Sequence, residues 1–236
     1  MTRSTPFGIL LGRQLAIGDV HGCSTALDRL LEVVSPAYAD NLIFLGDYVG
    51  KGPDSAVVLD RLIRLSADFN VIPLLGNHDE MLLDAVEGRT SREPWANGSR
   101  VTTIASYGGD LANVPAEHVD FLKSCRDGYE TDDHLLVHAN IDSTRALSDQ
   151  SPELLRWTRF TGEEPPHFSG KRVICGHAAQ KSGEPLNVGH AVCIDTYCWG
   201  GGWLTCLDLD KGHIWQASEA GETRTAWLND HMHLCC

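Results

Sequence analysis

The sequence predicts an α/β fold in which neighbouring strands of the first half run parallel, and three observations support this. Short apolar runs alternate with amphipathic segments through the first third of the chain. The second half carries short apolar runs separated by turn residues. Several apolar runs in both halves lead directly into a polar residue, most often just after a glycine. The alternation is typical of strand–helix–strand units, which place consecutive strands side by side and parallel.

Apolar periodicity assigns the elements of the first half. Leu27, Leu30, Leu31 and Val34 recur at helical spacing and would share one face of a helix. Short apolar runs bounded by turn residues mark the strands. Strands are therefore expected at 15–17, 42–45 and 71–75, and helices at 24–34, 54–66, 80–87, 100–107 and 117–125.

The second half is expected to add short strands, several of them antiparallel, at 135–137, 173–175, 192–194, 204–209 and 214–215. With 42% hydrophobic and 22% charged residues, the chain has the composition of an ordinary globular protein. No repeat, low-complexity tract or linker divides it. We therefore expect one domain over residues 1–236, with a core at about 15–216.

Charge and composition exclude several classes of protein. Lysine and arginine number 19 against 32 aspartates and glutamates, a net charge of −13, so nucleic acid would be repelled over most of the surface. No secretory signal is visible and no apolar stretch has transmembrane length, so we expect a cytoplasmic protein that is not embedded in a membrane. The eight cysteines form no CxxC pair and are expected to be reduced thiols. The sequence leaves the oligomeric state open.

Each of five predicted strands leads into a side chain of the metal-binding type. In open α/β sheets ligands bind beyond the carboxyl ends of the strands, so side chains scattered along the sequence meet there. The intervals from Asp19 to Asp47 and from Asp47 to Asn77 each match one strand–helix–strand unit. The candidate metal ligands are Asp19, His21, Asp47, Asn77, His138 and His177.

This ligand set indicates two divalent ions. Carboxylates, imidazoles and one amide suit manganese, iron or zinc better than calcium or magnesium, with manganese the first choice. Asp47 would bridge two ions roughly 3.5–4 Å apart, close enough to hold the substrate oxygens and to generate a hydroxide nucleophile. The glycines that precede four of the ligands would allow a positive φ or the close approach of an ion.

Three further side chains are assigned to catalysis. His78, which directly follows Asn77, is the candidate proton donor to the leaving oxygen. Lys51 and Arg159 are the candidates to hold phosphate oxygens, Arg159 in bidentate fashion and Lys51 as a point charge. A solvated loop lysine is an equally good interpretation of Lys51. Arg156 competes with Arg159, and is expected at the surface if Arg159 is the one that binds phosphate.

In their order these motifs resemble the phosphoprotein-phosphatase branch of the calcineurin-like metallophosphoesterases, whose signatures are GDxHG, GDxVDRG, GNH[ED], HA and GH. All five have counterparts, and the resemblance extends from about Leu15 to Leu209. It implies an α/β sandwich of two mixed β-sheets flanked by helices, and metal-dependent hydrolysis of phosphomonoesters. We therefore expect a bacterial or phage-type serine/threonine protein phosphatase, with tyrosine as a further target, acting on a phosphorylated protein or a small phosphomonoester.

The second motif departs from the family pattern, because Gly50 and Lys51 replace its aspartate and arginine. In relatives that aspartate orients the proton-donating histidine and the arginine binds the phosphate. The resemblance therefore implies that His78 lacks its orienting partner unless another carboxylate, such as Asp79, replaces it. Changing Gly50 to aspartate would restore the family arrangement, provided that the turn accepts a side chain.

Two other functions stay open. The segment Cys198-Trp199-Gly200-Gly201 and the small residue at position 50 also resemble the sister branch that hydrolyses diadenosine tetraphosphate symmetrically, although residues 138–142 lack the Pro-x-Trp usual there. Gly50 and Lys51 would also suit a phosphate-binding module with little turnover, against which the intact ligand set argues. The C-terminus is expected to be frayed rather than to bind metal, in spite of its His231, His233, Cys235 and Cys236.

Overall fold

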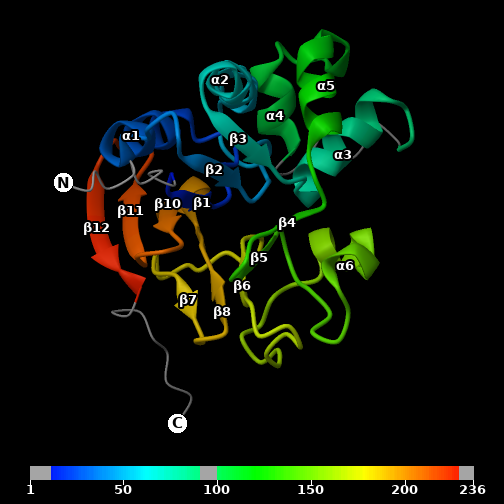
Figure 1. Ribbon diagram of the computed structural model, residues 1–236. Coiled ribbons are helices and arrows are strands. Elements are labelled where there is room, and N and C mark those ends of the chain that lie inside the picture. The colour runs from blue at the N-terminus through cyan, green and yellow to red at the C-terminus, as the bar shows by residue number, and fades with distance from the viewer. Residues whose placement is uncertain (1–11, 91–99, 229–236) are drawn as a thin grey trace, which may run out of the picture.

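The computed structural model of the protein describes residues 12–90 and 100–228. Two mixed β-sheets pack face to face, and most of the helices gather on the outer side of the first sheet (Figure 1). This confirms the expected α/β sandwich. The molecule therefore has three apolar layers: one between the sheets and one on the outer face of each.

The first sheet joins the two ends of the described chain. Its first three strands in sequence are parallel, as predicted, and its later strands are antiparallel to their neighbours. The strand order is β12 (Thr223–Trp227), β11 (His213–Ala217), β10 (Trp203–Asp208), β1 (Gln14–Ile17), β2 (Asn41–Phe44) and β3 (Asn70–Pro73), with β9 (Asp195–Thr196) paired to β10.

The second sheet is built from the middle of the chain. Its order is β4 (Gly128–Glu130), β5 (His134–Val137), β6 (Arg172–Cys175), β8 (Ala191–Cys193) and β7 (Leu186–Asn187). The antiparallel pairing expected in the second half holds for β10 and β11, but β5, β6 and β8 run parallel to one another. Long crossover connections separate these three strands, and such connections favour parallel neighbours.

Alternation along each strand decides which layer a side chain enters. Leu15 and Ile17 of β1 pack with the helices, whereas Ala16 faces the second sheet, where Leu136 and Ile174 meet it in the layer between the sheets. On the helical side lie α1 (Ser24–Val34), α2 (Ser55–Asp68), α3 (Asn77–Val86), α4 (Arg100–Ser106) and α5 (Ala116–Ser124), whereas α6 (Pro152–Trp157) packs against the second sheet.

Helix α3 begins earlier than the sequence pattern predicted. The apolar period placed its start at position 80, but the helix begins at Asn77. The reason is its N-terminal cap: the Asp79 carboxylate accepts the backbone N–H of Gly76 at 3.0 Å and so satisfies a donor of the first turn. This early start places Asn77 and His78 directly beyond β3.

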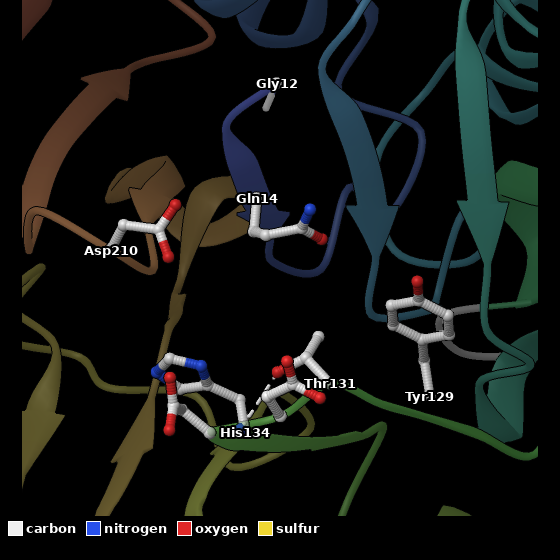
Figure 2. Close-up of a pocket in the computed structure, with 8 residues that line it drawn as sticks. Gly12, Gln14, Tyr129, Thr131, His134 and Asp210 are labelled. Atoms are coloured by element: carbon white, nitrogen blue, oxygen red, sulfur yellow. Dashed lines mark hydrogen bonds between the residues drawn. The ribbon is translucent and has the colours of Figure 1, made fainter. Parts of the chain in front are cut away.

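A cavity of about 350 Å³ opens at the other end of the strands (Figure 2). Gln14 and His134, the first residues of β1 and β5, line it together with Asp132, Asp133 and Asp210. Neither lysine nor arginine is among the described residues that line it. Three aspartates would repel a phosphorylated substrate, so this cavity is a poor candidate for the predicted chemistry.

The described residues also bear on the expectations about membrane-spanning segments and about the cysteines. None of their helices is long and apolar enough to cross a membrane. All six described cysteines are free thiols, as expected, and five of them are buried. The C-terminal group of His231, His233, Cys235 and Cys236 lies outside the described residues.

Candidate metal centre

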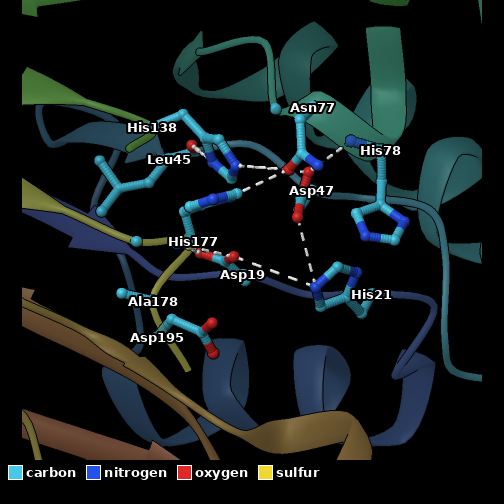
Figure 3. Close-up of polar contacts among 12 residues, drawn as sticks. Asp19, His21, Leu45, Asp47, Asn77, His78, His138, His177, Ala178 and Asp195 are labelled. Atoms are coloured by element: carbon cyan, nitrogen blue, oxygen red, sulfur yellow. Dashed lines mark hydrogen bonds and ion pairs between the residues drawn. The ribbon is translucent and has the colours of Figure 1, made fainter. Parts of the chain in front are cut away.

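The six predicted ligands come together at one edge of the sandwich (Figure 3). Four of them follow β1, β2 and β3 of the first sheet, and two follow β5 and β6 of the second. Parallel strands end at the same edge of their sheet, and the two sheets are packed together, so segments far apart in sequence meet there. The group consists of Asp19, His21, Asp47, Asn77, His138 and His177.

Backbone strain is concentrated at this edge. His21, Asp47 and His177 have φ values of 48°, 53° and 61°, in the left-handed region that favours glycine. Elsewhere in the described chain only Ser35 and Tyr197 are non-glycine residues with positive φ. Each such residue costs about 1–3 kcal/mol and persists only where its surroundings fix it, as they commonly do at functional sites.

Two glycines allow the turns to approach one another. A Cβ atom on Gly46, whose φ is +102°, would lie 2.6 Å from the backbone nitrogen of Gly76. A Cβ atom on Gly176 would lie 2.0 Å from Oδ1 of Asp19. Both distances are far below contact, so a side chain at either position would collide with a neighbouring turn, and Gly46 also has the positive φ that the sequence analysis allowed.

Asp47 lies between two groups of candidate ligands. Its Oδ2 is 3.3 Å from Nε2 of His21, and its Oδ1 is 3.5 Å from Nε2 of His138. His78 belongs to the first group and His177 to the second, and in each group the possible ligand atoms lie within 4.8 Å of one another. A carboxylate shared by two such groups has the position of a bridging ligand in a two-metal site.

Asn77 and Asp19 complete the arrangement from opposite sides. Oδ1 of Asn77 is 3.2 Å from Nε2 of His138 and 3.1 Å from Nδ1 of His177. The carboxylate of Asp19 accepts the backbone N–H of His177 at 3.0 and 3.2 Å. Its Oδ2 also lies 4.0 Å from Nε2 of His21. Every predicted ligand thus touches at least one other.

Backbone carbonyls fix the tautomers of two histidines. His21 donates its Nδ1–H to the carbonyl of Val49 at 2.9 Å, and His138 donates its Nδ1–H to the carbonyl of Leu45 at 2.8 Å. Each ring therefore directs an Nε2 lone pair into the centre, and that of His21 is buried without a hydrogen-bond partner among the described residues. Burial lowers the pKa of both rings, so both are neutral, as metal ligands must be.

Buried carboxylates crowd the same place. Burial, followed by the charges of Asp195 and Asp47, raises the pKa of Asp19. Burial, followed by the charge of Asp79, raises the pKa of Asp47. Clustered carboxylates with unpaired imidazole nitrogens form a donor set that fits divalent cations, which would remove the repulsion.

Asp195 is a site residue that the sequence analysis did not assign. It is 1% exposed, and its Oδ1 accepts the backbone N–H of Tyr197 at 3.1 Å. Its Oδ2 is buried without a partner among the described residues, and burial raises its pKa to about 6. Figure 3 places it beside Asp19 and Ala178. The signal was present, because Asp195 follows the strand expected at 192–194 just as the other carboxylates follow theirs.

The three side chains assigned to catalysis lie around this group. The His78 ring meets the His21 ring edge-on, with ring centroids 4.8 Å apart. Burial, followed by the positive charge of Lys51, lowers the pKa of His78 to about 3. Arg159 is exposed, but after burial and Lys51 its charge also lowers the pKa of His177. Lys51 and Arg159 therefore both lie near the centre.

The expectation that Arg156 lies at the surface is wrong. Its side chain is 9% exposed and forms ion pairs with Glu80 and Asp127, each at 3.3 Å. Glu80 belongs to α3 and Arg156 to α6, so the pair ties together two helices on different sides of the centre. The structure gives Arg156 a structural role and leaves Arg159 as the arginine at the rim.

Asp79 does not replace the missing orienting aspartate. Its carboxylate is fully buried and accepts the backbone N–H groups of Asp47, Tyr48, Gly76 and Val49 at 2.7, 2.9, 3.0 and 3.2 Å. These contacts fasten the turn after β2 to the start of α3. Asp79 therefore fixes the backbone of the ligands rather than the His78 ring.

We expect Asp79→Asn to lower the free energy of unfolding by roughly 2–4 kcal/mol, because an amide cannot accept four N–H bonds and its NH₂ would face donors. Urea unfolding measures the loss. The matched control is Asp84→Asn on the same helix, where the aspartate is partly exposed and pairs with Arg89. Equal stability of the two variants would contradict the role assigned to Asp79.

The sequence is similar to those of several curated proteins. A relative from Acidovorax sp. (strain JS42) is 37% identical over 158 residues, which are 62% of this chain and 52% of the relative. One from Janthinobacterium sp. (strain Marseille) is 32% identical over 164 residues, 64% of this chain and 56% of the relative. Both are named symmetrical bis(5'-nucleosyl)-tetraphosphatase. The chain spans about half the length of these curated relatives.

The prediction of a protein phosphatase is therefore wrong, since the curated relatives carry the name of the alternative branch. The motifs that suggested it place metal ligands, and ligands of this kind serve either substrate. A solved structure whose name proposes a diadenosine tetraphosphatase superposes with a TM-score of 0.65 and 23% identity, over 93% of this chain and 95% of that one. At this identity the likeness shows the fold alone.

The family itself is shown by a direct match. The model of the calcineurin-like phosphoesterases matches residues 12–183, which include all six predicted ligands and all three residues assigned to catalysis. Members of this family use two divalent metal ions, which agrees with the paired ligand groups around Asp47. The chain belongs to the calcineurin-like phosphoesterase family.

Proposed function

We propose that this chain hydrolyses a dinucleoside tetraphosphate symmetrically and releases two nucleoside diphosphates. The observation that carries the proposal is the name shared by the two curated relatives. The centre supports it, because paired ligand groups that share Asp47 suit the hydrolysis of a phosphoanhydride as well as that of a phosphoester. A nucleotide substrate also accords with the cytoplasmic location expected from the sequence.

Two divalent cations would be held by the six predicted ligands, with Asp47 shared between them. When bound, they supply Lewis-acid polarisation of a phosphate and activation of the attacking water. Manganese is the first choice, because the donors mix imidazole nitrogen with carboxylate oxygen. The chain's own contribution is to hold these donors in neutral or anionic form and in fixed orientation, through the carbonyls of Val49 and Leu45.

Positive charge near the centre would attract the polyphosphate. The whole chain carries −13, so a tetraphosphate meets a repulsive field over most of the surface. Lys51 and Arg159 are the side chains placed to reverse that field locally, and we assign them to the phosphate oxygens. The charges of both side chains reach the centre. Burial lowers the pKa of His177, and the two positive charges lower it further. Burial raises the pKa of Asp195, and the two positive charges oppose that rise.

The state of His78 favours an anhydride over an alkyl ester. With a pKa of about 3, its imidazole carries no positive charge near neutral pH and offers one N–H as a hydrogen-bond donor. A departing alkoxide requires a proton, whereas a departing nucleoside diphosphate is weakly basic and requires little help. A neutral His78 therefore suits a substrate whose leaving group is a nucleoside diphosphate.

The products of diadenosine tetraphosphate test the proposal. The manganese-loaded protein is incubated with this substrate and the nucleotides are separated by ion-exchange chromatography. We expect ADP alone, because symmetrical cleavage breaks the central anhydride. AMP together with ATP would contradict the symmetry. Release of phosphate from a phosphoserine peptide, with the dinucleotide intact, would overturn the proposed substrate class. Tight binding of diadenosine tetraphosphate without products would favour the phosphate-binding module.

We expect His78→Ala to slow hydrolysis of an alkyl phosphate about tenfold more than hydrolysis of diadenosine tetraphosphate, because the hydrogen bond from its N–H matters most to the strongly basic alkoxide. Initial rates of the same enzyme preparation on the two substrates give the ratio. Metal content is measured in parallel, since His78 belongs to one of the ligand groups. Equal slowing on both substrates, with the metals retained, would count against a hydrogen bond from His78 to the leaving oxygen.

A further inference from the structure

We propose that Trp199 is a positioning residue that holds the ammonium group of Lys51 beside the metal centre, where it receives a phosphate. The inference rests on the proposed function for its choice of substrate, but not for the binding of phosphate itself. It concerns two residues in different loops, one after β2 and one after β9. The family resemblance attaches no role to the tryptophan.

The first observation is the contact itself. Nζ of Lys51 lies 4.4 Å from the centroid of the Trp199 ring, which is the geometry of a cation–π interaction. Within the described residues the ammonium has neither an ion pair nor a hydrogen bond, so its three donors are available to a ligand. The Trp199 ring that carries the ammonium lies 6.4 Å, between centroids, from the ring of His21, so the charge lies close to a candidate metal ligand.

The second observation is that the turn that carries Trp199 is held by its own backbone contacts. It belongs to a short 3₁₀ turn, Cys198–Gly200, flanked by two residues with positive φ, Tyr197 at 64° and Gly201 at 93°. Backbone bonds close the turn, from the N–H of Gly200 and that of Gly202 to the carbonyl of Tyr197 at 3.0 and 2.9 Å. A rigid turn of this kind presents its side chain in one place.

Ring contacts fix the orientation of the indole. The ring of Tyr197 meets it edge-on at 4.6 Å between centroids, and the ring of His21 does so at 6.4 Å. Its Nε1 is buried and has no acceptor among the described residues, so packing rather than hydrogen bonding places the ring. Since Lys51 lies over the ring, we assign Trp199 to the lysine rather than to stacking with a nucleobase.

The third observation explains why the lysine needs support. The resemblance of the second motif to the family implies arginine at position 51, whose planar fork binds phosphate oxygens with little loss of freedom. Lysine has a flexible stem and loses more conformational entropy for each contact that it makes. A ring that attracts the ammonium reduces that loss. Trp199 would thereby compensate for the replacement of arginine by Lys51.

Affinity for inorganic phosphate, measured by calorimetry on the manganese-loaded protein, tests the pair. We expect Trp199→Leu to weaken phosphate binding roughly 3- to 30-fold, and Trp199→Phe, which keeps an aromatic face, to weaken it less. Combined with Lys51→Met, Trp199→Leu should have no further effect. The matched control is Trp203→Leu, because Arg224 lies over the Trp203 ring at the same 4.4 Å. That variant should bind phosphate as the wild type does.

A second measurement keeps the shape of the ring. Fluorinated tryptophans, incorporated during expression, weaken the attraction of the ring for a cation but keep a ring of nearly the same size at this position. Phosphate affinity should fall with increasing fluorination, and this fall should disappear in Lys51→Met. Equal losses with and without Lys51→Met would overturn the inference, and so would an unchanged affinity in folded, metal-loaded Trp199→Leu. Failure to hydrolyse diadenosine tetraphosphate, with the phosphate results intact, would instead count against the proposed function alone.

Discussion

Asp47→Asn should strip metal from both groups of ligands, lowering the affinity for each ion by more than about a hundredfold. Each carboxylate oxygen of Asp47 lies next to a different histidine, Oδ2 next to His21 and Oδ1 next to His138. Asparagine keeps one oxygen and turns an NH₂ group toward the other side, where it repels a cation. Elemental analysis after dialysis should find both ions depleted, and hydrolysis should fall with them.

Two controls separate bridging from general damage. His177→Ala removes a residue from only one of the two groups, so one ion should be weakened more than the other. Asp84→Asn changes a partly exposed aspartate of α3 and should leave both ions in place. If the Asp47→Asn protein retains two tightly bound ions per chain, the shared carboxylate is not a bridge.

Gly50→Ala should have the second largest effect, with a loss of about 2–4 kcal/mol in the free energy of unfolding and a marked loss of bound metal. Gly50 has φ of +116°, which side chains rarely adopt. A Cβ atom there would lie 2.8 Å from Nδ1 of His78 and 2.9 Å from Nδ1 of His21. Alanine must therefore displace at least one of these rings, and His21 is a candidate ligand.

A control variant separates the two effects of Gly50→Ala, which are the crowding of the histidine rings and the strain of a positive φ. Gly109 has φ of +91° and no heavy atom within 4 Å of a Cβ placed on it, so Gly109→Ala carries strain alone. Thermal unfolding and metal content of the two variants are compared. If the Gly50→Ala protein is as stable as the Gly109→Ala protein and keeps its full metal content, the two histidine rings move away from the added Cβ without a cost in free energy, and the prediction is wrong.

The same geometry corrects the expectation that aspartate at position 50 would restore the family arrangement. That expectation required the turn to accept a side chain at position 50. The turn does not accept one without moving the histidines, so the condition is not met. Position 50 does face His78, as the resemblance implied, but at too short a distance. Glycine is required here by the approach of two imidazoles, and the neutral state of His78 follows from burial without a carboxylate partner.

The sequence predicted which side chains come together at this edge, because its signals are local. A polar residue directly after a buried strand, repeated at one strand–helix–strand interval, is enough to bring Asp19, Asp47 and Asn77 together. The same local signals fixed β1, α1, β2 and α2 to within two residues of their observed bounds at either end. These elements depend on alternation and helical period, which are properties of the sequence itself.

Other features depend on contacts between distant segments, and the sequence did not predict them. The ion pairs of the buried Arg156 side chain join α6 to residues 80 and 127, and no local pattern distinguishes that arginine from Arg159. The short strands β4, β7, β9 and β12 were missed, because their formation depends on neighbours rather than on apolar runs. The choice between phosphatase and tetraphosphatase was missed for a related reason, since the motifs describe the metal ligands and not the substrate.

The two sheets contribute to the centre in different ways. The first sheet brings the carboxylates, His21 and Asn77, whereas the second brings His138 and His177. Cations bound there would connect the two sheets, which are otherwise held together by apolar contacts. Ligation would then be thermodynamically linked to the docking of one sheet on the other, so a chelator that empties the site would loosen the whole sandwich and not its catalytic edge alone.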